Sequence, residues 1–156
     1  MSGFAGRVAV VTGAGSGIGR ALALSLARRG TRLALSGVDE AGLAETVGMT
    51  AQTEVHQARL DVADRAAFDA YAAQVAAHFG RVNQVYNNAG IAFSRTVLES
   101  EWADYERILG VNLWGVIHGT KVFLPHLIAS GEGHVVNISS LNGYLAQPKM
   151  SHYVTS

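Results

Sequence analysis

The sequence contains no cysteine and only two prolines among its 156 residues. The lack of cysteine excludes disulfides, zinc sites with thiolate ligands and thiol catalysis, and the cytoplasm is the expected compartment. Charged residues are also scarce, at 15%, and the 12 basic and 12 acidic side chains cancel. A balanced charge gives no electrostatic footprint for nucleic acid, so no nucleic-acid partner is expected.

Long apolar runs are missing as well, so no membrane span and no membrane partner are predicted. The N-terminal segment carries one arginine and breaks into glycines, unlike a signal peptide. Six histidines occur without the His-x3-His or His-Glu-x-x-His spacing of a metal site. We therefore predict no metal site and expect each histidine on the surface or at a helix end.

Apolar residues make up 49% of the chain and glycines number 18, which indicates one domain with a real core and tight turns over residues 1–156. Short β-branched runs predict strands at Val8–Val11, Leu33–Leu35, Val55–Leu60, Val82–Tyr86 and His134–Ser139. Between them, helical spacing and capping residues predict helices at Ile18–Arg29, Asp39–Val47, Asp64–Phe79 and Glu101–Ala129, the last in one or two pieces. The tail from Leu141 to Ser156 is expected to start as a loop.

The alternation of strands and helices indicates βαβ units and a parallel sheet with helices on both faces. The fold class is therefore α/β, a doubly wound parallel sheet. The continuously apolar first and fifth strands are expected to be buried on both faces. Phe68, Tyr71 and Val75 are expected on the core side of their helix, and Trp102 and Trp114 are expected to pack.

A glycine-rich segment from Thr12 to Gly19 lies between the first strand and the first helix. Unpaired N–H groups and the positive end of the helix dipole make such a turn suitable for a dinucleotide pyrophosphate. Glycine is needed because a Cβ would block the turn and keep the phosphates away, and at Gly19 it would crowd the approach of helix and phosphate. The alternative is a plain strand-to-helix turn, but its place in the first βα unit favours cofactor binding.

Four further motifs accompany this turn. They are Leu60-Asp61-Val62, Asn87-Asn88-Ala89-Gly90, Val111-Asn112, and Asn137-Ile138-Ser139-Ser140 with Tyr153 thirteen residues after Ser140. Together the five motifs resemble the short-chain dehydrogenase/reductase family, and the resemblance covers the whole chain. It implies a Rossmann-type domain whose five strands have the order 3-2-1-4-5, with the later strands of the family missing.

The resemblance also implies the roles of individual residues. The residues implied to bind the cofactor are Gly13, Ser16, Gly17, Ile18 and Gly19 at the pyrophosphate, Asp61 and Val62 at the adenine, and Asn88, Ala89 and Gly90 beside the cofactor. The residues implied to be catalytic are Asn112, Ser140 and Tyr153.

The implied reaction is the interconversion of a secondary alcohol and a ketone or aldehyde, with the hydride carried by NAD or NADP. A tyrosine serves as the general acid or base when nearby positive charge lowers its pKa from about 10. Ser140 would hydrogen-bond the substrate oxygen. Asn112 would hold a helix irregularity and a water that continues the proton path.

The sequence departs from the family pattern in one catalytic position. The family has Lys four residues after the catalytic Tyr, whereas here the chain ends with Tyr153-Val154-Thr155-Ser156. We therefore expect a C-terminally incomplete dehydrogenase that is inactive by itself. A dinucleotide-binding fragment without catalysis and an interaction module remain open, since in this family the long helix after Trp102 commonly joins subunits. A homo-oligomer, dimer or tetramer, is expected of the full-length form.

A second departure concerns the choice between NAD and NADP. Gly37 stands where NAD-using members often carry an acidic residue at the end of the second strand. Asp39 follows two residues later and either binds the adenosine ribose or, as we favour, caps the next helix. No basic residue stands at Ser16, Gly37 or Val38 to bind a 2′-phosphate, so the sequence favours NAD and leaves NADP open.

Overall fold

The structure, a computed structural model, describes residues 3–50 and 53–156. Five parallel strands form one sheet in the order β3-β2-β1-β4-β5. The strands are β1 (Val8–Thr12), β2 (Arg32–Gly37), β3 (Val55–Arg59), β4 (Gln84–Asn87) and β5 (His134–Asn137). The predicted fold class and strand order are therefore confirmed.

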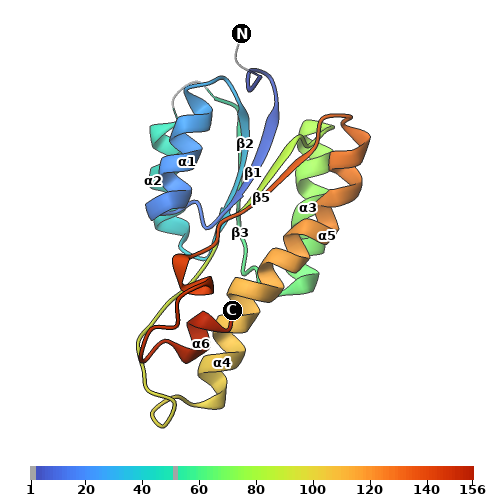
Figure 1. Cartoon of the computed structure of the whole chain (residues 1–156). Helices are drawn as coiled ribbons and strands as arrows, with labels where there is room; N and C mark the ends of the chain where they lie inside the picture. The colour runs from blue at the N-terminus through green and yellow to red at the C-terminus, as the bar shows by residue number, and fades with distance from the viewer. Residues whose placement is uncertain (1–2, 51–52) are drawn as a thin grey trace.

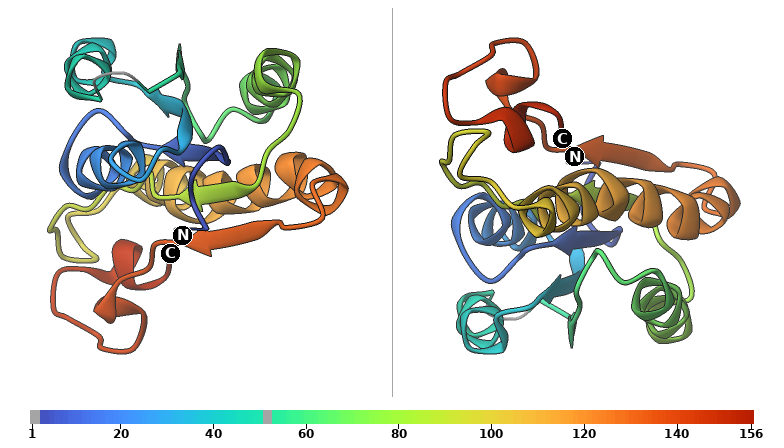
Figure 2. Two further views of the ribbon diagram at one scale, coloured as in Figure 1. Left: turned by 90° about the horizontal axis from the view of Figure 1, so that it is seen from above. Right: turned by 90° about the horizontal axis from the view of Figure 1, so that it is seen from below.

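Helices cover both faces of the sheet (Figure 1). One face is covered by α1 (Gly17–Ala27) and α2 (Glu40–Met49), and the other by α3 (Arg65–Phe79) and α5 (Gly115–Ala129) (Figure 2). The remaining helical segments are α4 (Trp102–Leu109), the π-helical turn η1 (Gly110–Trp114), the 3-10 turn η2 (Leu141–Gly143) and α6 (Ser151–Val154). Within the described ranges, no helix is long and apolar enough to cross a bilayer.

The central strand β1 is buried on both faces, which explains its continuously apolar sequence. Val8 and Val10 pack with the side chains of α3 and α5, whereas Ala9 and Val11 pack with those of α1 and α2. This alternation follows from the two-residue period of a strand. On the α3 side, the core-facing residues predicted for that helix are buried, as expected: Phe68, Tyr71 and Val75.

Two expectations about burial are wrong. β5 is an outer strand of the sheet, and Val135 is exposed to 37% rather than buried on both faces. Trp102 and Trp114 are exposed to 83% and 52%, because α4 and η1 extend past the ends of the strands (Figure 1). His152 lies at a helix end, as expected, in the last turn of α6 (Ser151–Val154), and it is fully buried against the rings of Phe93 and Tyr105. The errors at β5 and at the two tryptophans concern tertiary contacts that periodicity does not report.

The helix predicted over Glu101–Ala129 consists of α4 and α5 with η1 between them. The tail that was expected to start as a loop contains η2 and then α6, which packs beside α4 (Figure 1). Asp39 and Asp64 both cap helices, since their side chains accept hydrogen bonds from the backbone N–H groups of Gly42 and Ala67. The predicted caps are therefore confirmed.

Because β5 is an outer strand, we predict that the 156-residue chain self-associates. Unpaired backbone groups at a sheet edge are a template for pairing with another chain, and Val135 and Ile138 expose apolar surface there. Sedimentation velocity should show larger species as concentration rises, and Val135→Lys should increase the monomer fraction. A monodisperse monomer at all concentrations would contradict this prediction.

Candidate functional site

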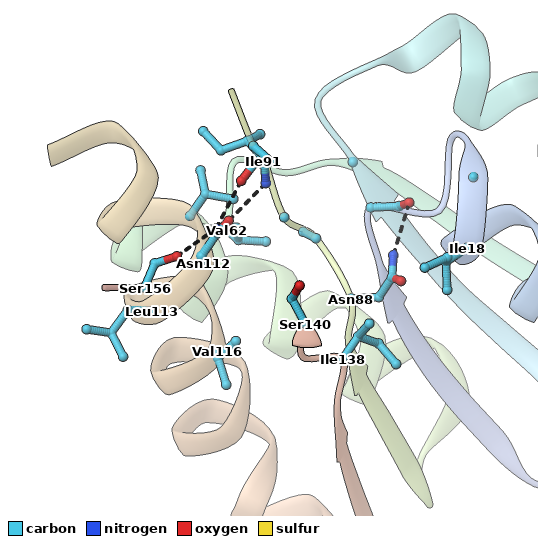
Figure 3. A pocket seen from close by; sticks show the side chains of 18 of the residues that line it. Ile18, Val62, Asn88, Ile91, Asn112, Leu113, Val116, Ile138, Ser140 and Ser156 are labelled. Carbon is cyan, nitrogen blue, oxygen red and sulfur yellow. Dashed lines mark hydrogen bonds between the residues drawn. The ribbon is translucent and has the colours of Figure 1, made fainter. Parts of the chain in front are cut away.

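A cavity of about 830 Å³ lies at the carboxyl ends of the strands. Figure 3 shows Asn112 on one side of it, Asn88 and Ile18 on the other, and Ser140 between them. The cavity is lined by all of the residues that the sequence motifs predicted: Gly13, Ser16, Gly17, Ile18, Gly19, Asp61, Val62, Asn88, Ala89, Gly90, Asn112, Ser140 and Tyr153. The structure therefore brings five separate motifs to one place.

The turn between β1 and α1 depends on glycine at two positions with a left-handed backbone. Gly13 has φ +65° and Gly17 has φ +53°, conformations that other residues rarely adopt. A Cβ on Gly13 would lie 2.8 Å from the Cα of Ala89, whereas a Cβ on Gly17 would meet no atom within 4 Å. Protein atoms therefore fill the space beside Gly13, whereas the space beside Gly17 is free.

Gly19 is needed for a reason that differs from the expected one. A Cβ at this position would overlap the carbonyl oxygen of Gly13 and come within 2.6 Å of the side-chain nitrogen of Asn88. The space that a side chain would need is therefore filled by the protein itself rather than reserved for a phosphate. Gly19 allows α1 to start directly behind the turn.

Asn88 joins the end of β4 to the turn that follows β1. Its side-chain N–H group donates to the carbonyl oxygen of Thr12 at 2.9 Å and to that of Gly13 at 3.4 Å. The backbone N–H groups of Asn88 and Ala89 both donate to the hydroxyl of Thr12 at 3.0 Å. Four hydrogen bonds thus fix the floor of the cavity between the two central strands.

Asn112 lies in η1, which confirms the helix irregularity expected at this residue. Its side-chain oxygen accepts from the backbone N–H of Ile91 at 2.9 Å, and its side-chain nitrogen donates to the carbonyl oxygen of Ile91 at 3.0 Å. The same nitrogen donates to the hydroxyl of Ser156 at 3.0 Å (Figure 3). Asn112 thus connects η1, the segment after β4 and the segment after α6.

Ser140 and Tyr153 reach the cavity from two segments that follow β5. Ser140 precedes η2, and its hydroxyl accepts from the backbone N–H of Asn142 at 3.2 Å. Tyr153 lies on the short helix α6, which cannot hold its position alone. α6 is tied down by a hydrogen bond of 2.9 Å between the hydroxyls of Ser151 and Tyr105.

The segment from 91 to 100 contacts the chain just before α6. The backbone N–H of Arg95 donates to the carbonyl oxygen of Lys149 at 2.9 Å, and the Arg95 guanidinium pairs with Asp104 of α4 at 2.6 Å. The backbone N–H of Glu101 and, to a smaller extent, this guanidinium hold the pKa of Asp104 below its usual value. The ion pair attaches the segment to α4.

The charged groups that line the cavity are both acidic. Asp39 uses one carboxylate oxygen to cap α2, and Asp61 accepts from the backbone N–H of Ala63 at 3.0 Å. No lysine or arginine of the described chain lines the cavity. Nor do the described residues contain a group of three side chains that could hold a metal ion.

Sequence reasoning missed two residues that touch the back of the glycine turn. The Arg20 guanidinium donates to the carbonyl oxygen of Gly15 at 2.6 Å, and the Thr46 hydroxyl contacts the carbonyl oxygen of Ala14 at 2.9 Å. Thr46 belongs to α2, so this contact depends on how two helices dock. Only the position of Arg20 directly after the last glycine was a visible signal.

A parallel sheet with a glycine turn after β1 and a cavity at the strand ends is the architecture of dinucleotide-binding α/β proteins. The profile of the short chain dehydrogenase family matches residues 7–156. The chain therefore belongs to the short-chain dehydrogenase/reductase family.

Its relatives include SadH of Mycobacterium tuberculosis, an oxidoreductase by name, which is 59% identical over 155 residues, 98% of this chain and 56% of SadH. Levodione reductase of Leifsonia aquatica is 35% identical, over 98% of this chain and 59% of that enzyme. A short-chain dehydrogenase/reductase of Burkholderia phymatum, solved in complex with NAD, is 42% identical with a TM-score of 0.95, covering 99% of this chain and 56% of that one. The chain spans about half the length of the curated relatives it matches.

The packing at Gly19 predicts a loss of stability when a methyl group is added. Gly19→Ala should lower the free energy of unfolding by about 1 to 3 kcal/mol, because the backbone of Gly13 cannot easily move. Gly48→Ala is the matched control: its Cβ would meet no atom within 4 Å, so the change should raise stability by about 0.5 to 1 kcal/mol. Urea unfolding of both variants checks the opposite signs, and equal effects would contradict the packing role.

Proposed function

We propose that the chain is the cofactor-binding part of an NAD(P)-dependent oxidoreductase that interconverts a secondary alcohol and a ketone or aldehyde. The observation that carries the proposal is that the residues of five separate motifs line one cavity at the carboxyl edge of the sheet. The family membership supports an oxidoreductase, and the alcohol or ketone is the substrate class that we propose for the whole protein.

The residues of the turn fit a dinucleotide. Gly17 leaves open space where a Cβ would stand, and the N-terminus of the eleven-residue helix α1 offers N–H groups for a pyrophosphate. Ile18 exposes 65% of its surface beside this space. We assign the pyrophosphate to Gly13, Ser16, Gly17, Ile18 and Gly19.

The rest of the cavity receives the other parts of the cofactor. We assign the adenine to Asp61 and Val62, and the segment beside the nicotinamide half to Asn88, Ala89 and Gly90. When bound, the nicotinamide supplies the hydride chemistry. The protein's task is to hold the cofactor and to handle the proton of the substrate oxygen.

We assign that proton to the hydroxyl of Tyr153, which would act as general acid or base according to the direction of the reaction. The hydroxyl of Ser140 would donate a hydrogen bond to the same oxygen and fix its position. Asn112 would keep η1 and Ile91 in register and hold a water on the proton path. The shared cavity supports these three roles because all three residues line it.

A second candidate, cofactor binding without efficient turnover, is favoured for the 156-residue chain tested alone. A tyrosine needs nearby positive charge to serve as a base at neutral pH, and no lysine or arginine of the described residues lines the cavity. General-base catalysis contributes about 10² to 10⁴ in rate. We propose that the chain alone binds the cofactor and oxidises alcohols more slowly than the full-length protein, by about 10² to 10⁴-fold.

This proposal predicts a large difference between the chain alone and a longer polypeptide. Joining the C-terminal part of SadH, a full-length relative, after Ser156 should raise alcohol-dependent NADH formation about 10² to 10⁴-fold. In the longer protein, Tyr153→Phe and Ser140→Ala should each remove most of that gain without changing NADH affinity. Tyr144→Phe is the control, since Tyr144 is 90% exposed and does not line the cavity. Equal rates for the short and long proteins, or an active Tyr153→Phe variant, would contradict these roles.

We further propose that the cofactor is NAD rather than NADP. Asp39 lies at the cavity edge near Gly37, and its carboxylate would accept from the ribose hydroxyls and repel a 2′-phosphate. The related Burkholderia phymatum protein was solved with NAD, which supports the same preference.

The NAD preference is tested by Asp39→Asn. Asparagine is as good a helix cap as aspartate, so α2 keeps its N-terminus while the charge is lost. We expect NADPH affinity to rise about tenfold, because a unit charge a few ångströms away is worth about 1 to 4 kcal/mol. Fluorescence titration with NADH and NADPH measures the ratio, and an unchanged ratio would contradict the role of Asp39.

Two predictions of the sequence remain proposals for the full-length form: a homo-oligomer, dimer or tetramer, and a cytoplasmic location. The large exposed apolar side chains of α4, η1 and α5 support an oligomer, since monomers rarely leave such a surface uncovered. They are Trp102, Leu113, Trp114, Leu124 and Ile128.

A further inference from the structure

Two side chains behind the glycine turn hold its carbonyl oxygens. The Arg20 guanidinium donates to the carbonyl of Gly15 at 2.6 Å, and the Thr46 hydroxyl lies 2.9 Å from the carbonyl of Ala14. Arg20 also donates to the Thr46 hydroxyl at 3.0 Å, so the two form one network. Thr46 is fully buried, where an unpaired polar group would be costly.

The network is possible because α2 lies directly against the turn. A Cβ on Gly42 would come within 2.8 Å of the carbonyl oxygen of Gly15, and a Cβ on Gly15 would lie 3.2 Å from the backbone nitrogen of Leu43. Glycine faces glycine at this contact, which lets Thr46 reach Ala14. The first turn of α2 therefore forms the back wall of the cofactor turn.

Holding these carbonyls also sets the direction of the next amides. In a planar trans peptide, the C=O of one residue and the N–H of the following residue point in opposite directions. The N–H groups of Gly15 and Ser16 therefore point away from Thr46 and Arg20. Both residues line the cavity, and neither amide donates a hydrogen bond to any residue in the described part of the chain. Successive unpaired amides of this kind form an anion-binding concavity.

We propose that Arg20 and Thr46 are positioning residues that preset the phosphate-binding amides of the glycine turn. The inference rests on the proposed cofactor site and deepens it. Neither side chain lines the cavity, so neither would touch the cofactor. The charge of Arg20 is paired with Glu45 at 2.7 Å, and its role is therefore geometric rather than a general attraction for phosphate.

The proposal is tested by variants that remove single hydrogen bonds. Thr46→Val keeps the shape and loses the donor, Thr46→Ser keeps the hydroxyl, and Arg20→Lys keeps the charge but loses the fork that reaches both Gly15 and Thr46. Thr50→Val is the matched control, since Thr50 is also a buried threonine at the end of α2, but its hydroxyl donates to Val47 and not to the turn.

Affinities of the 156-residue chain are measured by NADH fluorescence and by its displacement with ADP-ribose or adenosine. Thr46→Val and Arg20→Lys should bind NADH and ADP-ribose at least tenfold more weakly than wild type does. Both variants should bind adenosine with an affinity within twofold of wild type, because adenosine has no pyrophosphate, whereas NADH and ADP-ribose do. Thr46→Ser should restore affinity to within twofold. Thr50→Val should lower the melting temperature without changing any affinity.

Several outcomes would overturn the inference. One is unchanged ADP-ribose affinity in Thr46→Val. Another is an equal loss for ADP-ribose and adenosine, which would indicate general loosening of the fold. If Thr46→Val does not fold, Arg20→Lys decides the question by the same comparison. If the wild-type chain binds neither NADH nor ADP-ribose, the proposed function itself fails, which is a different result from a wild type that binds and variants that bind equally well.

Discussion

Two adjacent asparagines at the end of β4 hold the central strands together where the cavity opens. Asn88 donates to the carbonyl of Thr12 in β1, and Asn87 donates to the side chains of Asn137 in β5 at 2.8 Å and Thr120 in α5 at 3.1 Å. Neighbouring residues of a strand point to opposite faces, so this pair reaches in two directions. Asn87 is buried, so the two hydrogen bonds of its side-chain nitrogen favour this arrangement of β4, β5 and α5.

The two sides of the cavity are attached to the segment after β4 in different ways. On one side, Gly19 lets α1 start against Gly13 and Asn88, and α2 supports the turn from behind. On the other side, Asn112 attaches η1 to Ile91, just beyond the segment that Asn88 begins. The proposed division of labour, with the phosphates on the first side and the reacting groups on the second, follows from these attachments.

The sequence predicted the strands and the helix caps because these features are local, whereas the strand order and the roles of the residues around the cavity were implied by the family resemblance. Glycines with a left-handed backbone, capping aspartates and short apolar runs each leave a signal within a few residues of chain. The network of Arg20 and Thr46 leaves no signal beyond the position of Arg20 after the last glycine, because it joins residues 26 positions apart through the docking of α2. The exposure of Trp102 was missed for the same reason, since it depends on how α4 lies beyond the sheet.

We propose that one cavity at the carboxyl edge of the sheet binds a dinucleotide through the amides of the glycine turn. Titration of the ¹⁵N-labelled chain with NADH, followed by amide chemical shifts, tests it most directly. We expect large, saturable shifts at Gly15, Ser16, Gly17 and Gly90, and none at Gly131, which lies beyond the far end of α5. Saturable shifts elsewhere with an unchanged turn, or no shifts at all, would contradict it.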